Sequence, residues 1–132
     1  MKVLIIGNGG RESAVAKKLA EDKRISKLYF AKGNATTELL GENLPFDSVS
    51  ELRDFAIKEQ IDFTFVGPEL PLVKGIVDEF QKHDLKIFGP TKRAADLEGS
   101  KAFSKKFMVE NGVRTVKAEI FDSYVLAKEY VH

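Results

Sequence analysis

The sequence contains no cysteine and no tryptophan, and it has only two histidines, His83 and His132. Without cysteine, the chain can form no disulfide bond, no thiol nucleophile and no cysteine-based metal site. Two histidines far apart in the chain do not form the clustered ligand pattern of a histidine-rich metal centre. We therefore expect no metal site in these 132 residues.

A surplus of charge of one sign is also lacking. The chain carries 21 basic and 20 acidic residues, for a formal net charge of +1. Proteins that hold nucleic acids or anionic membranes by charge carry a clear basic surplus, so we expect neither as a partner. Any site for an anion must therefore be built locally.

Long hydrophobic runs are missing as well. No apolar run approaches the roughly 20 residues that a membrane-spanning helix needs. The apolar run after Met1 and Lys2 is too short for the core of a signal peptide. We therefore expect a cytoplasmic protein. Its length and its hydrophobic fraction of 43% suit one domain with a modest core, or one domain and the start of another.

Short, largely apolar segments alternate with helical patterns over the first two thirds of the chain. The expected strands cover residues 3–6, 28–31, 63–66 and 86–88. The expected helices cover residues 11–21, 50–60 (capped by Asp47 or Ser48) and a stretch from about Pro71 with an apolar stripe from Leu72 to Phe80. For residues 41–47 we expect a loop, with a short strand as the alternative. This alternation predicts an α/β fold with a parallel sheet, flanking helices and right-handed crossovers.

The pattern changes after residue 99. A helix is expected over 100–111, with Ala102, Phe103, Phe107 and Met108 directed inward. A weakly alternating strand over 116–121 and a helix over 124–131 follow. We expect residues 1–99 to form one domain, and residues 100–132 to be the truncated start of a second.

The expected strands all end in polar loops rich in glycine or proline. These loops are Gly7-Asn8-Gly9-Gly10, Lys32-Gly33-Asn34, Gly67-Pro68-Glu69 and Gly89-Pro90-Thr91. In a parallel sheet they lie at one edge, where open α/β sheets bind their ligands. Glycine lets the backbone approach a ligand closely, and the start of a helix presents free N–H groups to an anion.

The first loop resembles a dinucleotide-binding turn but departs from it in two places. The third glycine of G-x-G-x-x-G is replaced by Glu12, and the second strand ends in Lys32 where an acidic residue is expected. No Walker-type loop is present either. The residues favour a small, singly phosphorylated ligand. Its phosphate would be held by the amides of Gly9 and Gly10 with Arg11 or Lys32, and its hydroxyls or amine would meet Glu69 and Asn34.

A purely structural interpretation accounts for part of this pattern. Glycines after a strand often only form a tight turn, and Arg11 and Glu12 fit an exposed pair in a first helical turn. Lys32 alone is best read as a solvated side chain, and His83 as a surface residue late in a helix. The functional interpretation rests on four such loops meeting at one edge.

Longer motifs reveal a family resemblance. They are GNGGRE at 7–12, GNA at 33–35, VGPELPLVKGIVDEF at 66–80 and IFGPTKRAADLEGSKAFSKKFM at 87–108. In these stretches the chain resembles the N-terminal part of the phosphoribosylamine–glycine ligases. The resemblance implies a Rossmann-like module that precedes an ATP-grasp fold. It also implies a role in purine synthesis, in which ATP, with Mg²⁺ or Mn²⁺, drives the joining of glycine to 5-phosphoribosylamine.

The resemblance also implies which residues bind 5-phosphoribosylamine. They are Asn8, Gly9, Gly10, Arg11, Glu12, Pro68 and Glu69, with Lys32, Gly33 and Asn34 added from the second loop. Ser13 stands where the family usually has histidine, so any hydrogen bond from an imidazole there is replaced. No catalytic residue is expected in this chain. Without the ATP-grasp domains we expect no cofactor bound to it and no ligase activity from it alone.

Three other functions remain open. The chain could be a stand-alone, non-catalytic module that binds a phosphorylated metabolite, although the apolar positions after residue 99 need a covering partner. An NAD(P)-linked oxidoreductase is disfavoured by Glu12 and Lys32. A purine-pathway enzyme that carboxylates or formylates a ribonucleotide is a near neighbour, but the GPE and LEGSK stretches favour the glycine ligase.

Overall fold

The computed structural model describes residues 1–131. Its strands are β1 (Lys2–Gly7), β2 (Lys27–Lys32), β3 (Glu42–Leu44), β4 (Phe63–Val66) and β5 (Ile87–Phe88). Its helices are α1 (Gly10–Ala20), α2 (Ala35–Glu38), α3 (Val49–Lys58), α4 (Glu69–Val73), α5 (Ile76–Gln81), α6 (Lys92–Gly99), α7 (Lys101–Glu110) and α8 (Tyr124–Val131). Within this part of the chain, no helix is both long and apolar enough to cross a membrane.

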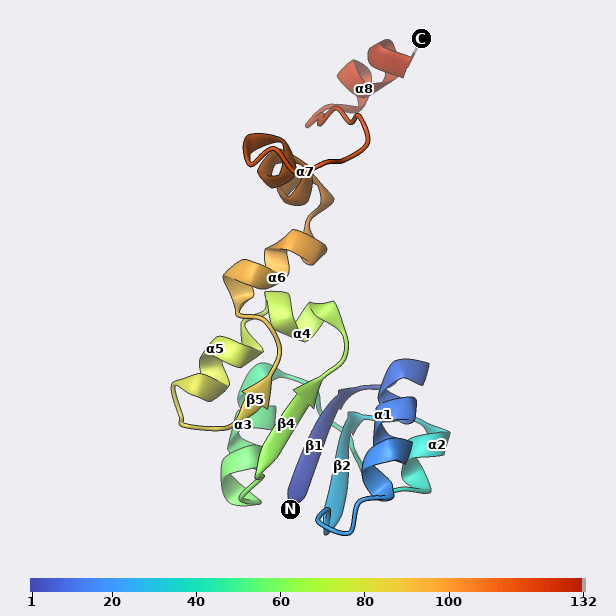
Figure 1. The fold of residues 1–132 in the computed structure, drawn as a ribbon, viewed down its shortest axis with the longest axis vertical. Helices are drawn as coiled ribbons and strands as arrows, with labels where there is room; N and C mark the ends of the chain where they lie inside the picture. The colour runs from blue at the N-terminus through green and yellow to red at the C-terminus, as the bar shows by residue number, and fades with distance from the viewer. Residues whose placement is uncertain (132) are drawn as a thin grey trace. The chain divides into compact units, whose positions relative to one another are not determined.

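The five strands form one sheet in the order β3-β2-β1-β4-β5, and every pair is parallel (Figure 1). The α/β, Rossmann-like fold predicted from the sequence is therefore confirmed, and the short strand at 42–44 forms. Register aligns the strand ends: Ile6 pairs with Ala31 of β2 on one side and with Val66 of β4 on the other. The loops that follow β1, β2 and β4 consequently lie at the same edge.

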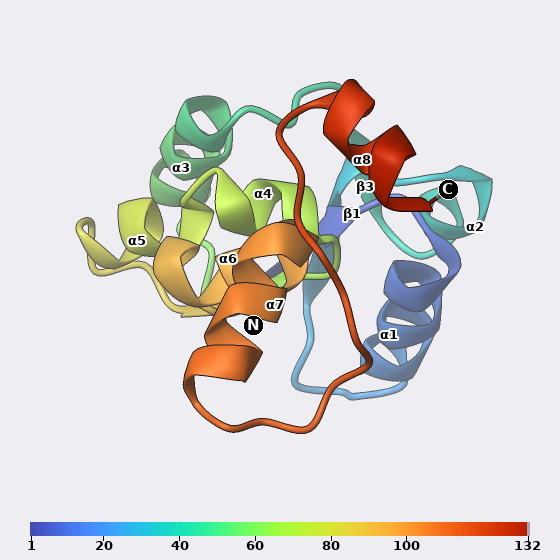
Figure 2. The ribbon, with the colours of Figure 1, turned by 90° about the horizontal axis from the view of Figure 1, so that it is seen from above.

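Helices cover both faces of the sheet, which explains why the strands are apolar without alternation. Val3 and Ile5 pack with Ala16 of α1 on one face. Leu4 and Ile6 pack on the other face, with side chains of α3, α4 and α5. Seen from above, α1 and α2 lie together on one side, and α3 and α5 lie on the other (Figure 2). Strand β1 is therefore buried at the centre of the fold.

The predicted helix from Pro71 to Phe80 is wrong as a single element. It divides into α4 and α5, because Gly75 adopts a left-handed backbone conformation with φ of +85°. Helix α4 also begins earlier than predicted, at Glu69, with Pro68 as its N-cap. The apolar stripe indicated a continuous helix because the spacing of apolar residues stays helical across the break. That spacing does not reveal a change in backbone conformation at a single glycine. The break brings the residue before it, Lys74, to the carboxyl edge of the sheet.

Residues up to Ala95 form one compact unit, and a second begins at Asp96. In the second unit, Ser100 caps α7 by accepting a hydrogen bond from the Phe103 amide. The strand predicted over 116–121 does not form, since weak alternation alone cannot make a strand without a partner. The inward direction predicted for α7 is also wrong: Phe103 and Phe107 are 43% and 40% exposed. A domain boundary near residue 99 stays a prediction.

Candidate functional site

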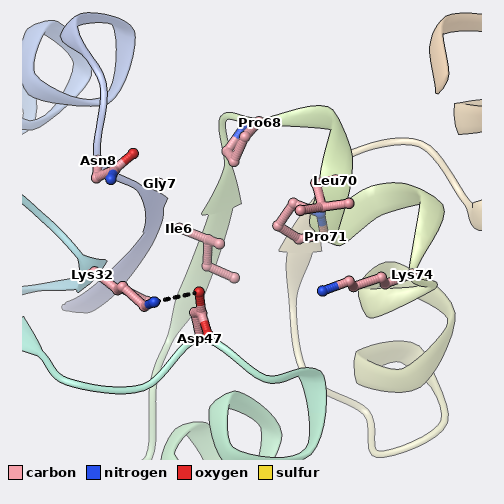
Figure 3. A pocket seen from close by; sticks show the side chains of 10 residues that line it. Ile6, Gly7, Asn8, Lys32, Asp47, Pro68, Leu70, Pro71 and Lys74 are labelled. Carbon is pink, nitrogen blue, oxygen red and sulfur yellow. Dashed lines mark ion pairs between the residues drawn. The ribbon is translucent and has the colours of Figure 1, made fainter.

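A pocket of about 240 Å³ lies between the loops that follow β1 and β4 (Figure 3). Ile6 and Ala31, at the ends of two central strands, provide apolar surface. Polar and loop residues complete the lining: Gly7, Asn8, Lys32, Asp47, Pro68, Leu70, Pro71 and Lys74. Its volume is below the roughly 300–1,000 Å³ typical of pockets for drug-sized ligands. The pocket therefore suits a small molecule better than a dinucleotide.

Two lysines face this pocket in different states. The amino group of Lys32 lies 3.0 Å from a carboxylate oxygen of Asp47, and both side chains are more than half exposed. The amino group of Lys74 points toward that of Lys32 across the pocket (Figure 3). In the part of the chain that the structure describes, no acidic side chain forms an ion pair with Lys74. The pocket is lined by two lysine ammonium groups and one carboxylate, so its local positive charge favours an anionic ligand.

The glycine loop turns directly into α1. Gly7 has φ of +129°, a conformation that disfavours any residue with a side chain. The Gly9 amide donates a 2.7 Å hydrogen bond to Oε2 of Glu12 and so already has an acceptor. Gly10 is the first helical residue, and helix-initial N–H groups have no acceptor within their own helix. The Gly10 amide is therefore available to an anion, and the Gly9 amide is not.

Glu12 lies beneath the loops and is only 3% exposed. A side-chain carbon at Gly7 would lie 2.6 Å from Cγ of Glu12, and one at Gly9 would lie 2.9 Å from Oε2. One at Gly67 would overlap Oε1. Oε1 itself is buried and has no hydrogen-bond partner. The structural alternative of an exposed Arg11–Glu12 pair is therefore wrong for Glu12, which fills a space that glycines leave open.

Asn34 joins the second loop to the first. Its Oδ1 caps α2 by accepting from the amides of Thr36 and Thr37, at 2.8 and 3.2 Å. Its Nδ2 donates to the Asn8 carbonyl and to the Ser13 hydroxyl, each at 2.9 Å. Ser13 in turn donates to the Gly9 carbonyl at 3.1 Å. The hydroxyl that replaces the family histidine is thus part of the support for the glycine loop.

The structure separates the predicted site residues into three groups. Asn8, Lys32 and Pro68 line the pocket. Gly9, Gly10, Arg11 and Glu69 lie in or next to the same two loops, at the starts of α1 and α4. Glu12, Gly33 and Asn34 shape the loops from behind; Gly33 has φ of +72°, and a side chain there would overlap Asn43. Contact of any of these residues with substrate stays a prediction.

Sequence reasoning missed two charged residues of the pocket. Asp47 attracted attention only as a possible cap of α3, a role that Ser48 takes by accepting from the Glu51 amide at 3.3 Å. Lys74 lay inside a pattern that predicted a continuous helix. The sequence does hold one signal for it, because the next residue, Gly75, is of the type that ends helices.

Shifted pKa values occur away from the pocket. Hydrogen bonds from Arg24 lower the pKa of Asp22 to about 2, and a hydrogen bond from Arg53 lowers the pKa of Glu79. Both carboxylates lie outside the pocket lining, so these shifts report surface ion pairs. Across residues 1–131, no group of three or more histidine or acidic side chains is placed to hold a metal ion.

Comparisons with known proteins agree on one family. Residues 1–98 match the family described as "Phosphoribosylglycinamide synthetase, N domain". The chain is 47% identical, over 99% of its length, to the phosphoribosylamine–glycine ligase of Caldanaerobacter subterraneus subsp. tengcongensis, and 49% identical to that of Clostridium acetobutylicum. In each case it covers 32% of the relative. The chain thus spans about a third of the length of these curated relatives.

Solved structures agree with this match. The crystal structure of phosphoribosylamine–glycine ligase from Thermotoga maritima aligns with 99% of the chain, with a TM-score of 0.69 and 29% identity, and the chain covers 30% of it. The biotin carboxylase subunit of pyruvate carboxylase aligns with a TM-score of 0.62 at 19% identity. The likeness to the biotin carboxylase subunit concerns the fold alone.

Proposed function

Because the chain belongs to the family of phosphoribosylglycinamide synthetase N domains, we propose that it supplies the 5-phosphoribosylamine site of a phosphoribosylamine–glycine ligase. In this reaction ATP phosphorylates the glycine carboxylate. The amine of phosphoribosylamine then attacks the acyl phosphate, and glycinamide ribonucleotide, ADP and phosphate result. We assign to this chain the binding of the phosphorylated amine. The cytoplasmic location expected from the sequence belongs to the same proposal.

Gly10 is the observation that supports this role most directly. Its φ is not in the left-handed region, and a side-chain carbon there would have no atom within 4 Å. Neither backbone strain nor packing therefore requires glycine at this position. Within a helix, alanine is generally more stable than glycine. The fold therefore does not require glycine at position 10, and the N–H group of this residue is open to an anion. Both features fit the close approach of a phosphate.

The pocket beside this loop supplies charge for the same ligand. Lys32 and Lys74 project into it, and Asn8 and Pro68 border it. Arg11 and Glu69 are exposed at the starts of the two neighbouring helices. A ribose phosphate lying across this edge has cations for its phosphate and a carboxylate for its amine.

ATP and its metal ion are assigned to other parts of the enzyme. ATP-grasp partner domains account for the remaining two thirds of the relatives' length in this proposal. Within residues 1–131, no group of three or more histidine or acidic side chains gathers to hold a metal ion. The chain's own task is therefore to bind and orient one substrate.

A titration with glycinamide ribonucleotide, followed by backbone amide NMR, tests the proposal. We expect saturable shifts at Gly10, Arg11 and Glu69, and none with NAD. Gly10→Ala should leave the thermal unfolding temperature unchanged or slightly raised. It should also weaken ribonucleotide binding about tenfold or more, because the methyl group separates the phosphate from a charge-assisted hydrogen bond. Unchanged affinity in Gly10→Ala, or no shifts in the folded wild-type chain, would contradict the proposed site.

A further inference from the structure

We propose that Glu12 is a positioning residue that sets the spacing between the two loops flanking the pocket. Its side chain acts as a spacer between the β1–α1 loop and the β4–α4 loop. Only the consequence for ligand binding rests on the proposed function. The spacer role itself concerns the unliganded fold.

The space around the carboxyl group carries the proposal. Glu12 occupies the volume that side chains at Gly7 and Gly67 would need, so its carboxyl group lies against both backbones. Gly7 precedes Asn8, and Gly67 precedes Pro68; both of these following residues line the pocket. Any change in the size of side chain 12 therefore moves both walls of the pocket.

The hydrogen bonding of the carboxylate explains why it stays in this place. Oε2 accepts the Gly9 amide at 2.7 Å, at the start of α1, where the helix dipole favours a negative charge. With one oxygen anchored there, the second is directed toward Gly67. Oε1 is buried without a partner. Buried polar atoms are nearly always hydrogen-bonded, so an exception needs an explanation, and a role in spacing the loops provides one.

Gly67 supports the same reading from the opposite loop. Its φ is not among the left-handed ones, so its backbone conformation does not require glycine. A side-chain carbon at residue 67 meets only atoms of Glu12 among its nearest neighbours. Glycine at 67 is therefore explained by the presence of the Glu12 side chain. Residues 12 and 67 form a size-matched pair across two loops.

The experiment uses four variants of the 132-residue chain: Glu12→Ala, Glu12→Gln, Gly67→Ala and the double variant Glu12→Ala/Gly67→Ala. Backbone amide spectra are recorded first without ligand, with Asn8 and Leu70 as reporters of the two pocket walls. Binding of glycinamide ribonucleotide is then measured for each variant. Glu51→Ala is the control, because Glu51 is likewise an acidic residue in the first turn of a helix, α3, and does not line the pocket.

We expect Glu12→Ala and Gly67→Ala each to shift both reporter amides and to weaken ribonucleotide binding roughly tenfold, a usual effect of losing support behind a site. Glu12→Gln should remain close to wild type, because it keeps the volume and an acceptor for the Gly9 amide. The double variant should recover much of the wild-type spectrum and affinity, since the new methyl group fills part of the vacated space. Glu51→Ala should leave the reporters unchanged.

Other outcomes overturn the proposal and identify the alternative. If Glu12→Ala shifts Asn8 but not Leu70, Glu12 only caps α1. If Glu12→Gln loses binding with unchanged ligand-free spectra, Glu12 is a ligand of the substrate. If the double variant is no better than Glu12→Ala, the two positions are not size-matched. If the wild-type chain does not bind the ribonucleotide, the proposed function fails, and the ligand-free spectra alone decide the spacer role. Reporter shifts that stay at their wild-type values in Glu12→Ala and Gly67→Ala would refute that role.

Discussion

Single residues at the pocket differ in how strongly they are already engaged. Lys32 is paired with Asp47, and their side chains are 54% and 60% exposed. An exposed pair of this kind stabilises a fold by only about 0–1 kcal/mol, so an anionic ligand can compete with Asp47 for the lysine. Lys74 faces the pocket without an ion-pair partner in the described chain. Of the two, Lys74 has the smaller cost to overcome on binding a phosphate.

We predict that Lys74→Met weakens glycinamide ribonucleotide binding about fivefold at low salt, equivalent to roughly 1 kcal/mol for a partly exposed charge. The difference from wild type should shrink as ionic strength rises, because salt screens exposed charges. Isothermal titration at two salt concentrations measures both effects. Lys23→Met, an exposed lysine between α1 and β2 at the opposite edge, is the control and should bind normally. Equal effects of the two substitutions would contradict a local role for Lys74.

Among the secondary-structure elements, α2 connects the second loop to the glycine loop through one side chain. Asn34 caps α2 with its oxygen and holds Asn8 and Ser13 with its nitrogen. All four hydrogen-bonding positions of this amide are therefore occupied. Asn34 follows β2 at the edge of the sheet, and α2 holds the orientation of its amide through the two backbone N–H groups that it caps.

Asn34→Ala and Asn34→Asp separate the two roles of that side chain. Alanine removes both, and we expect a loss of about 2 kcal/mol in the free energy of unfolding. Aspartate keeps the cap but removes the donors to Asn8 and Ser13, so we expect a loss of about 1 kcal/mol. Urea unfolding measures both, and amide spectra should show the glycine loop changed in each variant. A loop left unchanged by Asn34→Asp would show that the two Nδ2 bonds do not hold it.

The break between α4 and α5 depends on the backbone of Gly75. A side-chain carbon there would make only ordinary contacts, 3.5 Å from Lys92 at the nearest, so packing does not forbid alanine. The left-handed φ of +85° does disfavour alanine, because a residue with a side chain loses about 1–2 kcal/mol of stability in this conformation. We predict this loss in the urea unfolding of Gly75→Ala. Gly10→Ala, with no left-handed φ, should show no loss; equal stability of the two variants would contradict the argument.

For the molecule as a whole, the most informative feature is its length relative to that of its curated relatives. The chain covers 32% of its curated relatives, and the family match ends at residue 98. In the unit that begins at Asp96, helices α7 and α8 contain no buried residue. The described chain therefore holds one sheet domain with a complete core and a second unit with none of its own.

We predict that the 132-residue chain releases no ADP in the presence of ATP, Mg²⁺, glycine and phosphoribosylamine. The reason is that the proposed ATP site belongs to regions of the relatives that this chain does not match. A coupled assay of ADP release measures the activity, with the Clostridium acetobutylicum ligase as the positive control. Release that depends on both glycine and phosphoribosylamine would refute the prediction.

Local patterns were sufficient to predict the parallel sheet and the edge at which the pocket lies. Apolar runs such as Val3–Ile6 mark doubly covered strands, and each expected strand ends at a loop rich in glycine or proline, so a parallel sheet with these loops at one edge follows from the alternation of strands and helices. The strand order came only from the structure. The same reasoning picked out the loops that contain Asn8, Lys32 and Pro68, which line the pocket, and the family resemblance added Asn8 and Pro68 as site residues. These features depend on neighbours within a few residues, and such neighbours are visible in a sequence.

Only the tertiary structure decided which side chains meet. Lys74 lines the pocket at the break between α4 and α5, where Gly75 adopts a left-handed conformation. Asp47 reaches the pocket because β3 lies beside β2 at the far end of the sheet order. Glu12 was predicted to bind substrate, with an exposed position as the structural alternative, but the loops after β1 and β4 enclose its side chain. The spacing of apolar residues indicates which positions are buried. It carries no information about which distant segments bury them. The sequence determined the fold and the edge, and packing between distant segments determined the pocket.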